Sequence, residues 1–372
     1  MLDHAAATTT VLTAPTPTAL DDPDAWALHG AAAVSRAVKL EHWGDADTAV
    51  TAQALLARQR EQRYATRVCL VATDPGREGD ADNVLGKALL TLPSQGNDHA
   101  AVLDVSVHPA ARRRGVGSAL LARGEALAAE AGRTTLVAAS EHAGEPDPGD
   151  PLALVAPTGS GRIRSDAAAA VVARRRGYAL AQAERYSTLD LPVDRDLLEA
   201  LRRDAAARAG GAYRLVSWAD AAPARWLDAF AELETRMTTD APVGEVDARE
   251  EVWDAARVRA RERQLAAAGF GYRAVAVQHV PDGALVGLTM VEYPRDRPEV
   301  VEQNDTIVLR AHRGRRLGML LKATMLADLA VERPAARRVH TWNAEENAPM
   351  LAINVALGFR PRGVVGLWQT SL

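Results

Sequence analysis

Residues 102–123 read VLDVSVHPAARRRGVGSALLAR, and this stretch decides the fold. An apolar strand pattern ends at Val107, a turn rich in arginine and glycine follows, and a helical pattern begins at Ser118. A glycine-bearing turn between a strand and a helix aims backbone N–H groups at one point, where the helix dipole adds positive potential. The turn therefore predicts a binding site for a phosphate or pyrophosphate, with charge-assisted hydrogen bonds from its arginines.

A second copy of this arrangement occurs later in the chain, where residues 306–330 read TIVLRAHRGRRLGMLLKATMLADLA. Neither copy ends in the Gly-Lys-Ser/Thr of a Walker A loop, and Leu120 occupies the place of the third glycine of a dinucleotide fingerprint. In the second copy Arg316 replaces the first glycine, and we expect it to open the helix, where a non-glycine backbone is tolerable. The predicted phosphate-binding residues are Arg112, Arg113, Arg114, Gly115, Val116, Gly117, Arg313, Gly314, Arg315, Arg316, Leu317 and Gly318.

Composition indicates an ordinary globular protein of two or three domains, with 372 residues, 48% apolar residues and a net charge of −4. This charge gives no electrostatic case for binding nucleic acid or a membrane surface. The lone Cys69 lies in an apolar run and predicts a buried thiol, which is compatible with a cytoplasmic location. Residues 1–22 have no basic segment of a signal peptide and are expected to form a tail or a first strand.

The order of predicted elements repeats along the chain. In both halves helical segments precede three strands, and the loop, its helix, a strand, a further helix and a last strand follow. Each further helix ends at a glycine–aromatic pair, Gly177-Tyr178 or Gly358-Phe359. This order favours duplication, with a tail at 1–22, a first domain at 23–195, a connecting helix at 196–211 and a second domain at 212–372. The segment 141–165 is expected to be a long loop.

Arg-x-x-Gly-x-Gly on a strand-to-helix turn, complete in the first copy and with Arg316 for the first glycine in the second, resembles the acetyl-coenzyme A loop of the GNAT (Gcn5-related N-acetyltransferase) superfamily. Each copy is followed by a Gly-aromatic pair. The chain is similar to actinobacterial two-domain members, with mycothiol synthase a more distant relative. The resemblance implies an α/β fold of two tandem domains, each a mixed, mostly antiparallel sheet flanked by helices. It also implies acetyl-CoA as cosubstrate, contacted by the strand backbone at Val107, Val308 and Leu309 and by Asn347, for which a helix N-cap is the alternative role.

The same resemblance implies that a carboxylate near the start of the strand before the loop acts as the general base. Eleven residues before Arg313 stands Glu302, whereas eleven before Arg112 stands Ala101. Asp305 is a second candidate base, and strand alternation predicts that it points to the face opposite Glu302. These residues predict a catalytic second domain and a first domain that binds coenzyme A without turnover or is purely structural.

The usual tyrosine acid of the family is missing, since Ala173 and Asn354 occupy its positions. Carboxylates in the helical region that precedes the second set of strands, including Glu234 and Asp240, would attract an ammonium acceptor, although a solvated acidic face is the alternative. We expect an N-acetyltransferase, monomeric or dimeric and without metal, that acts on a small-molecule amine. A non-catalytic acyl-CoA-binding or scaffold protein, or a protein N-acetyltransferase, remains the competing hypothesis.

Overall fold

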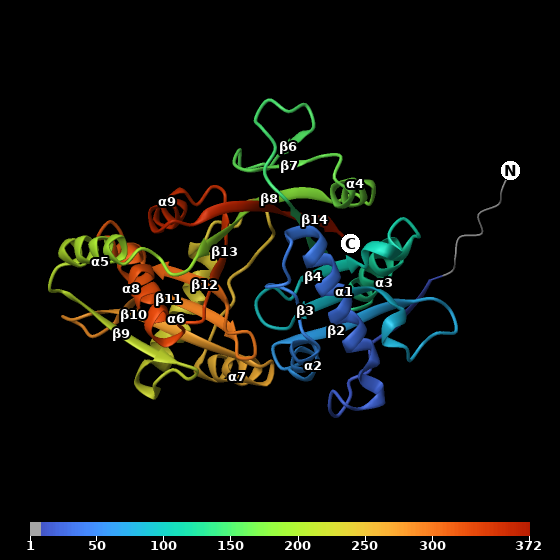
Figure 1. Cartoon of the computed structure of the whole chain (residues 1–372), viewed down its shortest axis with the longest axis horizontal. Helices are drawn as coiled ribbons and strands as arrows, with labels where there is room; N and C mark the ends of the chain where they lie inside the picture. Colours follow the sequence, from blue (N-terminus) through green and yellow to red (C-terminus); the bar gives the residue numbers. More distant parts are fainter. Residues whose placement is uncertain (1–8) are drawn as a thin grey trace. The chain divides into compact units, whose positions relative to one another are not determined.

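The computed structural model describes residues 9–372, which form two compact units (Figure 1). The units interleave along the chain. Unit 1 contains the described residues up to Ala143 together with Arg164–Ala181 and Gly366–Leu372, and unit 2 contains Gly144–Ile163 and Gln182–Val365. The predicted tail at 1–22 includes a short strand, and its residues 1–8 lie outside the described part.

Unit 1 contains a mixed sheet in the order β1-β2-β3-β4-β5-β14, in which β4 and β5 are parallel and the pairs from β1 to β4 are antiparallel. The buried residues of this unit come from both its helices and its sheet. Its strands are β1 (Thr10–Thr13), β2 (Ala65–Thr73), β3 (Val84–Pro93), β4 (Ala100–Val107), β5 (Thr135–His142) and the last part of β14 (Arg360–Ser371), and its helices are α1 (Trp26–Trp43), α2 (Ala52–Arg60), α3 (Val116–Glu130) and α4 (Ala168–Arg175).

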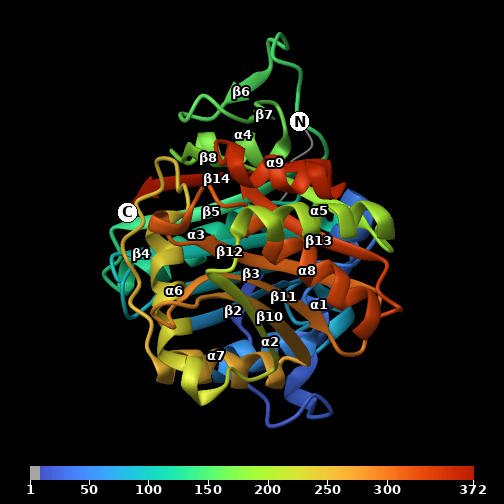
Figure 2. The ribbon, with the colours of Figure 1, turned by 90° about the vertical axis from the view of Figure 1, so that its left-hand side faces the viewer.

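Unit 2 repeats the plan with the sheet order β8-β13-β12-β11-β10-β9, in which β12 and β13 are parallel and the other pairs antiparallel (Figure 2). Its strands are β8 (Ala179–Asp190, from Gln182 onward), β9 (Tyr213–Ala219), β10 (Phe270–His279), β11 (Leu285–Pro294), β12 (Val300–Val308), β13 (Arg338–Ala344) and the first part of β14. Its helices are α5 (Arg195–Ala209), α6 (Leu227–Asp240), α7 (Ala255–Ala267), α8 (Leu317–Glu332) and α9 (Ala348–Leu357).

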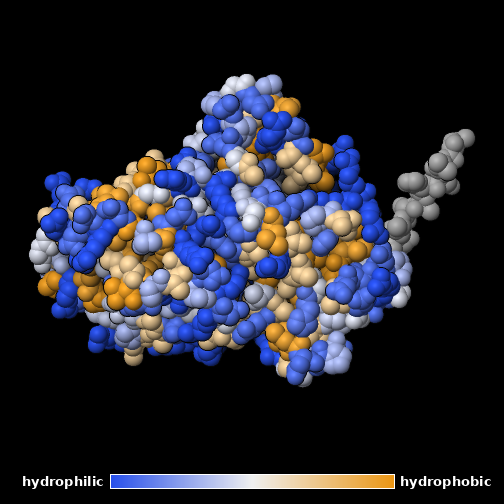
Figure 3. All heavy atoms as spheres, in the orientation of Figure 1, coloured by the Kyte–Doolittle hydropathy of each residue, from blue (hydrophilic) through white to orange (hydrophobic). Residues whose placement is uncertain are grey.

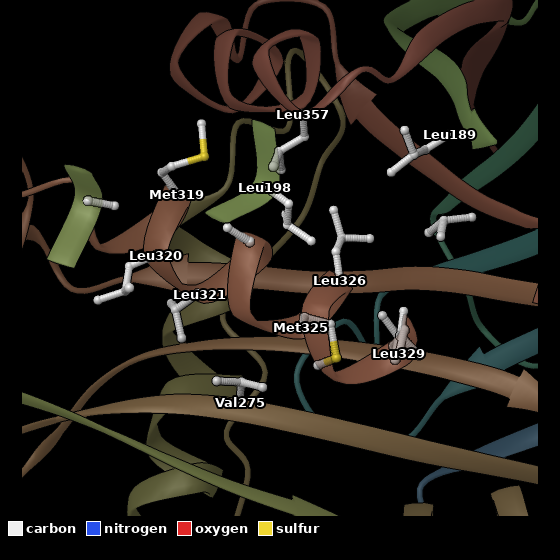
Figure 4. Packing of buried hydrophobic residues seen from close by; sticks show 14 of the residues in the cluster. Leu189, Leu198, Val275, Met319, Leu320, Leu321, Met325, Leu326, Leu329 and Leu357 are labelled. Atoms are coloured by element: carbon white, nitrogen blue, oxygen red, sulfur yellow. The ribbon is translucent and has the colours of Figure 1, made fainter. Parts of the chain in front are cut away.

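The sheet of unit 2 has an apolar layer on each face because strand residues alternate between the faces. Val275 and Val277 of β10 pack with α5 and α8, and Figure 4 shows the leucine and methionine side chains of α8 in this layer. Ala274 and Ala276 face the other way, into a cluster with side chains of α6 and α7. The sheet therefore presents one face to α5 and α8 and the opposite face to α6 and α7.

The predicted fold class of two tandem domains with mixed, mostly antiparallel sheets is confirmed. The helical region before the first set of strands consists of α1 and α2, and α2 begins at Ala52, where Thr51 caps it. One local expectation differs from the structure. The segment expected to be a long loop contains a small two-stranded sheet, β6 (Ala153–Val155) with β7 (Arg162–Arg164).

Hydrophilic residues cover much of the face shown in Figure 3, and hydrophobic residues lie between them singly and in small groups. Among residues 9–372 no helix has the length and apolar character needed to span a membrane.

Candidate active site

The two phosphate loops have left-handed backbone conformations at the same two positions, but the glycine occupies the second of these positions in the first loop and the first of them in the second loop. The first loop joins β4 to α3 and the second joins β12 to α8, each after a short 3-10 turn. Left-handed φ angles occur at two alternate positions in each loop, at Arg113 (61°) and Gly115 (84°), and at Gly314 (78°) and Arg316 (59°). Each loop thus has one glycine and one arginine in this region, which ordinary side chains adopt at a cost.

Arg316 does not open the helix as the sequence suggested. It is the N-cap residue, with φ 59° and ψ 19°, and the first helical residue is Leu317. The expectation of a tolerant helical backbone at this position is therefore wrong. Val116 and Leu317 begin the two helices with buried side chains, so only their backbone N–H groups are available to a phosphate.

Arginines of both loops make ion pairs with carboxylates. Arg313 Nη2 lies 2.8 Å from Asp240 Oδ2, and Arg310 Nε lies 3.1 Å from Asp240 Oδ1. Arg316 pairs with Asp204 of α5. These arginines are about half exposed or more, and such pairs contribute little stability, so a pyrophosphate can compete for them.

The first loop is paired in the same way. Arg112 Nη2 lies 2.5 Å from Glu41 Oε2, and Arg114 Nη2 lies 2.6 Å from Asp74 Oδ1. Cationic groups at the mouth of both loops are therefore held by exchangeable carboxylate partners, an arrangement that fits an anionic ligand.

Strand β12 carries a β-bulge that β4 lacks. Gln303 pairs with Val291 and Thr306 with Thr289, so β12 has one more residue than β11 between these pairs. The register between β3 and β4 is regular from Thr91–Val102 to Gly86–Val107. The buried amide of Gln303 holds the bulge, because its Nε2 donates to Met290 O at 2.7 Å and to Thr289 Oγ1 at 3.1 Å.

The bulge overturns the predicted opposite facing of the two candidate bases. Glu302 pairs directly with Glu292 on β11, so the two glutamates share a face of the sheet. Arg261 of α7 contacts Glu292 Oε1 at 2.9 Å and Asp305 Oδ2 at 3.8 Å. Asp305 therefore lies on the same face as Glu302, since the extra residue in β12 resets the alternation.

The bulge also changes which residue of unit 1 corresponds to Glu302. Val300 and Ala100 hold matching places beside the parallel neighbouring strand, paired with Arg338 and Thr135. Counting from these pairs, Val102 corresponds to Glu302, and the alignment with Ala101 is wrong by the one residue of the bulge. Neither Ala101 nor Val102 ionises, so unit 1 has no carboxylate at this position.

Arg261 is the centre of a partly buried cluster of charged side chains that sequence reasoning did not single out as a group. Its Nη1 lies 2.8 Å from Glu234 Oε2 of α6, in addition to its contacts with Glu292 and Asp305. The Glu234 side chain is 4% exposed, and its Oε1 has no hydrogen-bond partner. Burial raises the pKa of Glu234 to about 7; the charges of Asp305 and Glu292 add to this effect and Arg261 opposes it.

The corresponding place in unit 1 has the opposite balance of charge. Gly86 pairs with Val107 as Gly287 pairs with Val308, which makes Thr91 the counterpart of Glu292. Arg58 of α2 donates to the Thr91 hydroxyl, and Lys87 Nζ lies 3.0 Å from Asp104 Oδ2. Two cations and one carboxylate thus occupy the place where unit 2 has one cation and three carboxylates.

The positions of the missing tyrosine acid hold residues without an acidic proton. Asn354 is buried in α9 and donates from Nδ2 to Asn343 Oδ1 at 2.6 Å. Asn347 caps the same helix, since its Oδ1 accepts from Met350 N at 3.4 Å. Ala173 lies in α4 of unit 1.

Two histidines of unit 2 lie within hydrogen-bond distance of tyrosine hydroxyl groups. His340 is fully buried, and its Nδ1 lies 2.7 Å from Tyr186 Oη. His312 Nδ1 lies 3.0 Å from Tyr213 Oη. His340 pairs with Glu302 across the parallel strands, which adds a histidine–tyrosine pair beside the candidate base.

Comparison with known proteins supports this architecture. The sequence model of the acetyltransferase (GNAT) family matches residues 37–146. A solved tandem GNAT protein from the clavulanic acid biosynthesis pathway is 25% identical, with a TM-score of 0.71 and 98% of each chain covered. A GCN5-related N-acetyltransferase from Sphaerobacter thermophilus is 14% identical, with a TM-score of 0.57, and the match covers 98% of this chain and 95% of that one. No curated protein matches the chain significantly in sequence. Residues 37–146 are thus a GNAT acetyltransferase domain, and the repeated loops, the repeated sheets and these similarities give the chain the architecture of a tandem GNAT protein.

Proposed function

We propose that the protein transfers an acetyl group from acetyl-CoA to a small-molecule primary amine, and that unit 2 carries out the reaction. The observation that carries this proposal is the bulged strand β12, which leads into a phosphate loop and brings Glu302 and Asp305 to one face of the sheet. A carboxylate at this place can take the proton of an ammonium acceptor, directly or through water.

The second phosphate loop would hold the pyrophosphate of acetyl-CoA. Its Arg313 and Arg316 are about half exposed and pair with Asp240 and Asp204, and Arg313 also donates from Nε to Val308 O. The N–H groups at the start of α8 have the geometry of an anion site. The backbone N–H of Val308 would then donate to the acetyl carbonyl and stabilise the developing oxyanion. Transfer is direct, in a ternary complex, and much of the rate comes from the proximity of the two substrates.

Unit 1 would bind coenzyme A without turnover or serve the structure alone. Its loop has a glycine at 115 and arginines at 112 and 114, but its strand β4 has no bulge and no carboxylate corresponding to Glu302. The excess of cationic side chains around Asp104 would also repel an ammonium acceptor.

Two measurements test this function. Calorimetry should show acetyl-CoA binding that weakens in Arg313→Ala and Arg316→Ala, and a panel of primary amines should give amine-dependent release of free thiol. If the protein does not bind acetyl-CoA at millimolar concentration, the proposed function is wrong.

A non-catalytic acyl-CoA-binding protein is the competing function, and the observation in its favour is Asn354 at the position of the usual acid. Binding without thiol release across the amine panel would favour it. Thiol release with peptides but not with small amines would indicate a protein N-acetyltransferase.

A further inference from the structure

The Arg261 cluster contains more carboxylates than its single guanidinium can balance. The charged groups that face Glu234 are Arg261 from α7, Glu292 from β11 and Asp305 from β12. If all three carboxylates were ionised, the cluster would carry two uncompensated negative charges. Phe230, Trp253 and Met290 lie beside Arg261, and the Glu234 side chain is 4% exposed, so water screens the charge of Glu234 the least. Under these conditions one carboxyl group retains a proton near neutral pH.

Glu234 is the group that holds this proton. It is the least exposed of the three, at 4% against 14% for Glu292 and 29% for Asp305. One of its oxygens accepts from Arg261, while the other is buried without a partner, which is the atom where a proton removes the most unfavourable charge. Asp305 has the opposite properties, because it is the most exposed and the farthest from the guanidinium.

We propose, on the basis of the function proposed above, that Asp305 takes the proton of the acceptor ammonium and that Glu234, through Arg261, is a positioning residue whose own proton governs how strongly Asp305 does so. Glu234 and Asp305 contact the same Nη1 of Arg261 at 2.8 and 3.8 Å, so ionisation of one acts on the other at short range. When Glu234 is ionised, Asp305 shares the Arg261 guanidinium with a second anion and is held by it less strongly.

The chemical step balances in protons and electron pairs. The N–H bond of the acceptor ammonium breaks, and the proton moves to Asp305 Oδ. The nitrogen lone pair then attacks the carbonyl carbon of the thioester, a C–N bond forms and the C–S bond breaks with the electron pair going to sulfur. The amide nitrogen releases its second proton to water or to the thiolate, and Asp305 returns its proton to water.

The test is the pH profile of kcat at saturating substrates in the full-length protein. The wild type should show a rise in kcat near pH 7, where the pKa of Glu234 lies. Glu234→Gln stays neutral at every pH, so this rise should disappear and kcat above about pH 8 should fall several-fold, to the level of the wild type below about pH 6. KM for acetyl-CoA should be unchanged. Glu292→Gln removes one of the charges that raise the pKa of Glu234, so in this second variant the rise should move to lower pH.

Asp305→Asn should lower kcat roughly 10²–10⁴-fold, and Glu302→Gln should have a smaller effect. Infrared spectra of the free protein add a readout independent of turnover, because a protonated carboxyl band should titrate near pH 7 in the wild type and be absent in Glu234→Gln. An unchanged pH profile in Glu234→Gln, or a larger loss in Glu302→Gln than in Asp305→Asn, overturns the inference. A wild type without any amine-dependent turnover contradicts the proposed function instead.

Discussion

Lys322 has the clearest consequence for stability among single residues. Its side chain lies in the interior of α8 with 1% of its surface exposed, and its Nζ lies 5.1 Å from the centre of the Phe359 ring. Burial lowers the pKa of Lys322 to about 7. Below that pH the folded protein must bury a charge. Between pH 7 and about 10.4 the folded lysine is neutral while the unfolded one is still protonated, so stability rises with pH across this window.

We therefore expect Lys322→Leu to raise the free energy of unfolding of unit 2 by roughly 1–4 kcal/mol at pH 7 and to reduce its rise toward alkaline pH. Leu121 occupies the corresponding position of the first loop helix, which shows that the fold accepts leucine there. Denaturant unfolding at several pH values from about 6 to 9 measures both effects.

Lys322→Arg is the matched control, because arginine keeps its charge throughout this range. It should be less stable than the wild type, and its stability should lack the rise that Lys322 contributes. Equal pH slopes in all three proteins would contradict the assignment.

At the scale of elements, the bulge in β12 depends on Gln303. The amide of Gln303 satisfies the carbonyl oxygen of Met290 and bonds to the hydroxyl of Thr289, and its side chain is buried. Gln303→Leu leaves that buried oxygen without a donor, so we expect a loss of about 1–3 kcal/mol in stability. Because the bulge directs Asp305 toward Arg261, kcat should fall as well.

Asn304→Ala provides the comparison for Gln303, since Asn304 is the adjacent bulge residue and is exposed. It should change stability by less than about 0.5 kcal/mol. Thermal unfolding measures the stability of both variants, and thiol release measures their kcat. Similar losses of stability and kcat in the two variants would mean that Gln303 does not hold the bulge.

The left-handed residues of the second loop give another prediction at this scale. An added Cβ at Gly314 would meet nothing within 4 Å, so the cost of Gly314→Ala comes from the backbone alone, about 1 kcal/mol. Arg316→Gly should relieve the same kind of strain and gain up to about 1 kcal/mol. Its ion pair with Asp204 is lost too, but high salt screens that pair in both proteins.

Unfolding of the two loop variants in high salt is the measurement. Opposite signs of the stability change are expected. A stabilising Gly314→Ala would show that the loop does not hold the left-handed conformation in solution.

At the scale of the whole molecule, sequence predicted the architecture well because the loops, the Gly-aromatic pairs and the strand patterns are local signals. It could not show the bulge, since one extra residue between Glu302 and Thr306 leaves the apolar pattern almost unchanged. The alignment of Glu302 with Ala101 and the facing of Asp305 failed for that reason. The Arg261 cluster was missed because its members come from separate elements, and arginine on a helix ordinarily indicates a solvated face.

Equivalent substitutions in the two units can show which unit carries out the reaction. Gly117 and Gly318 are the second residues of α3 and α8, and an added Cβ would meet Val107 Cγ2 at 3.3 Å and Ile353 Cδ1 at 3.0 Å. Valine at either position therefore crowds its own phosphate loop to a similar extent. Since only unit 2 has the bulge and the carboxylates, we expect Gly318→Val to lower kcat/KM by roughly 10²-fold, the order of loss that follows from misplacing a substrate. Gly117→Val should leave kcat within about twofold of the wild type.

Calorimetry on the same variants tells whether unit 1 binds acetyl-CoA, because a second binding event would then disappear only in Gly117→Val. Circular dichroism checks that both variants are folded. A folded Gly117→Val protein without activity, beside an active Gly318→Val protein, would assign the reaction to unit 1 and reverse the proposed roles.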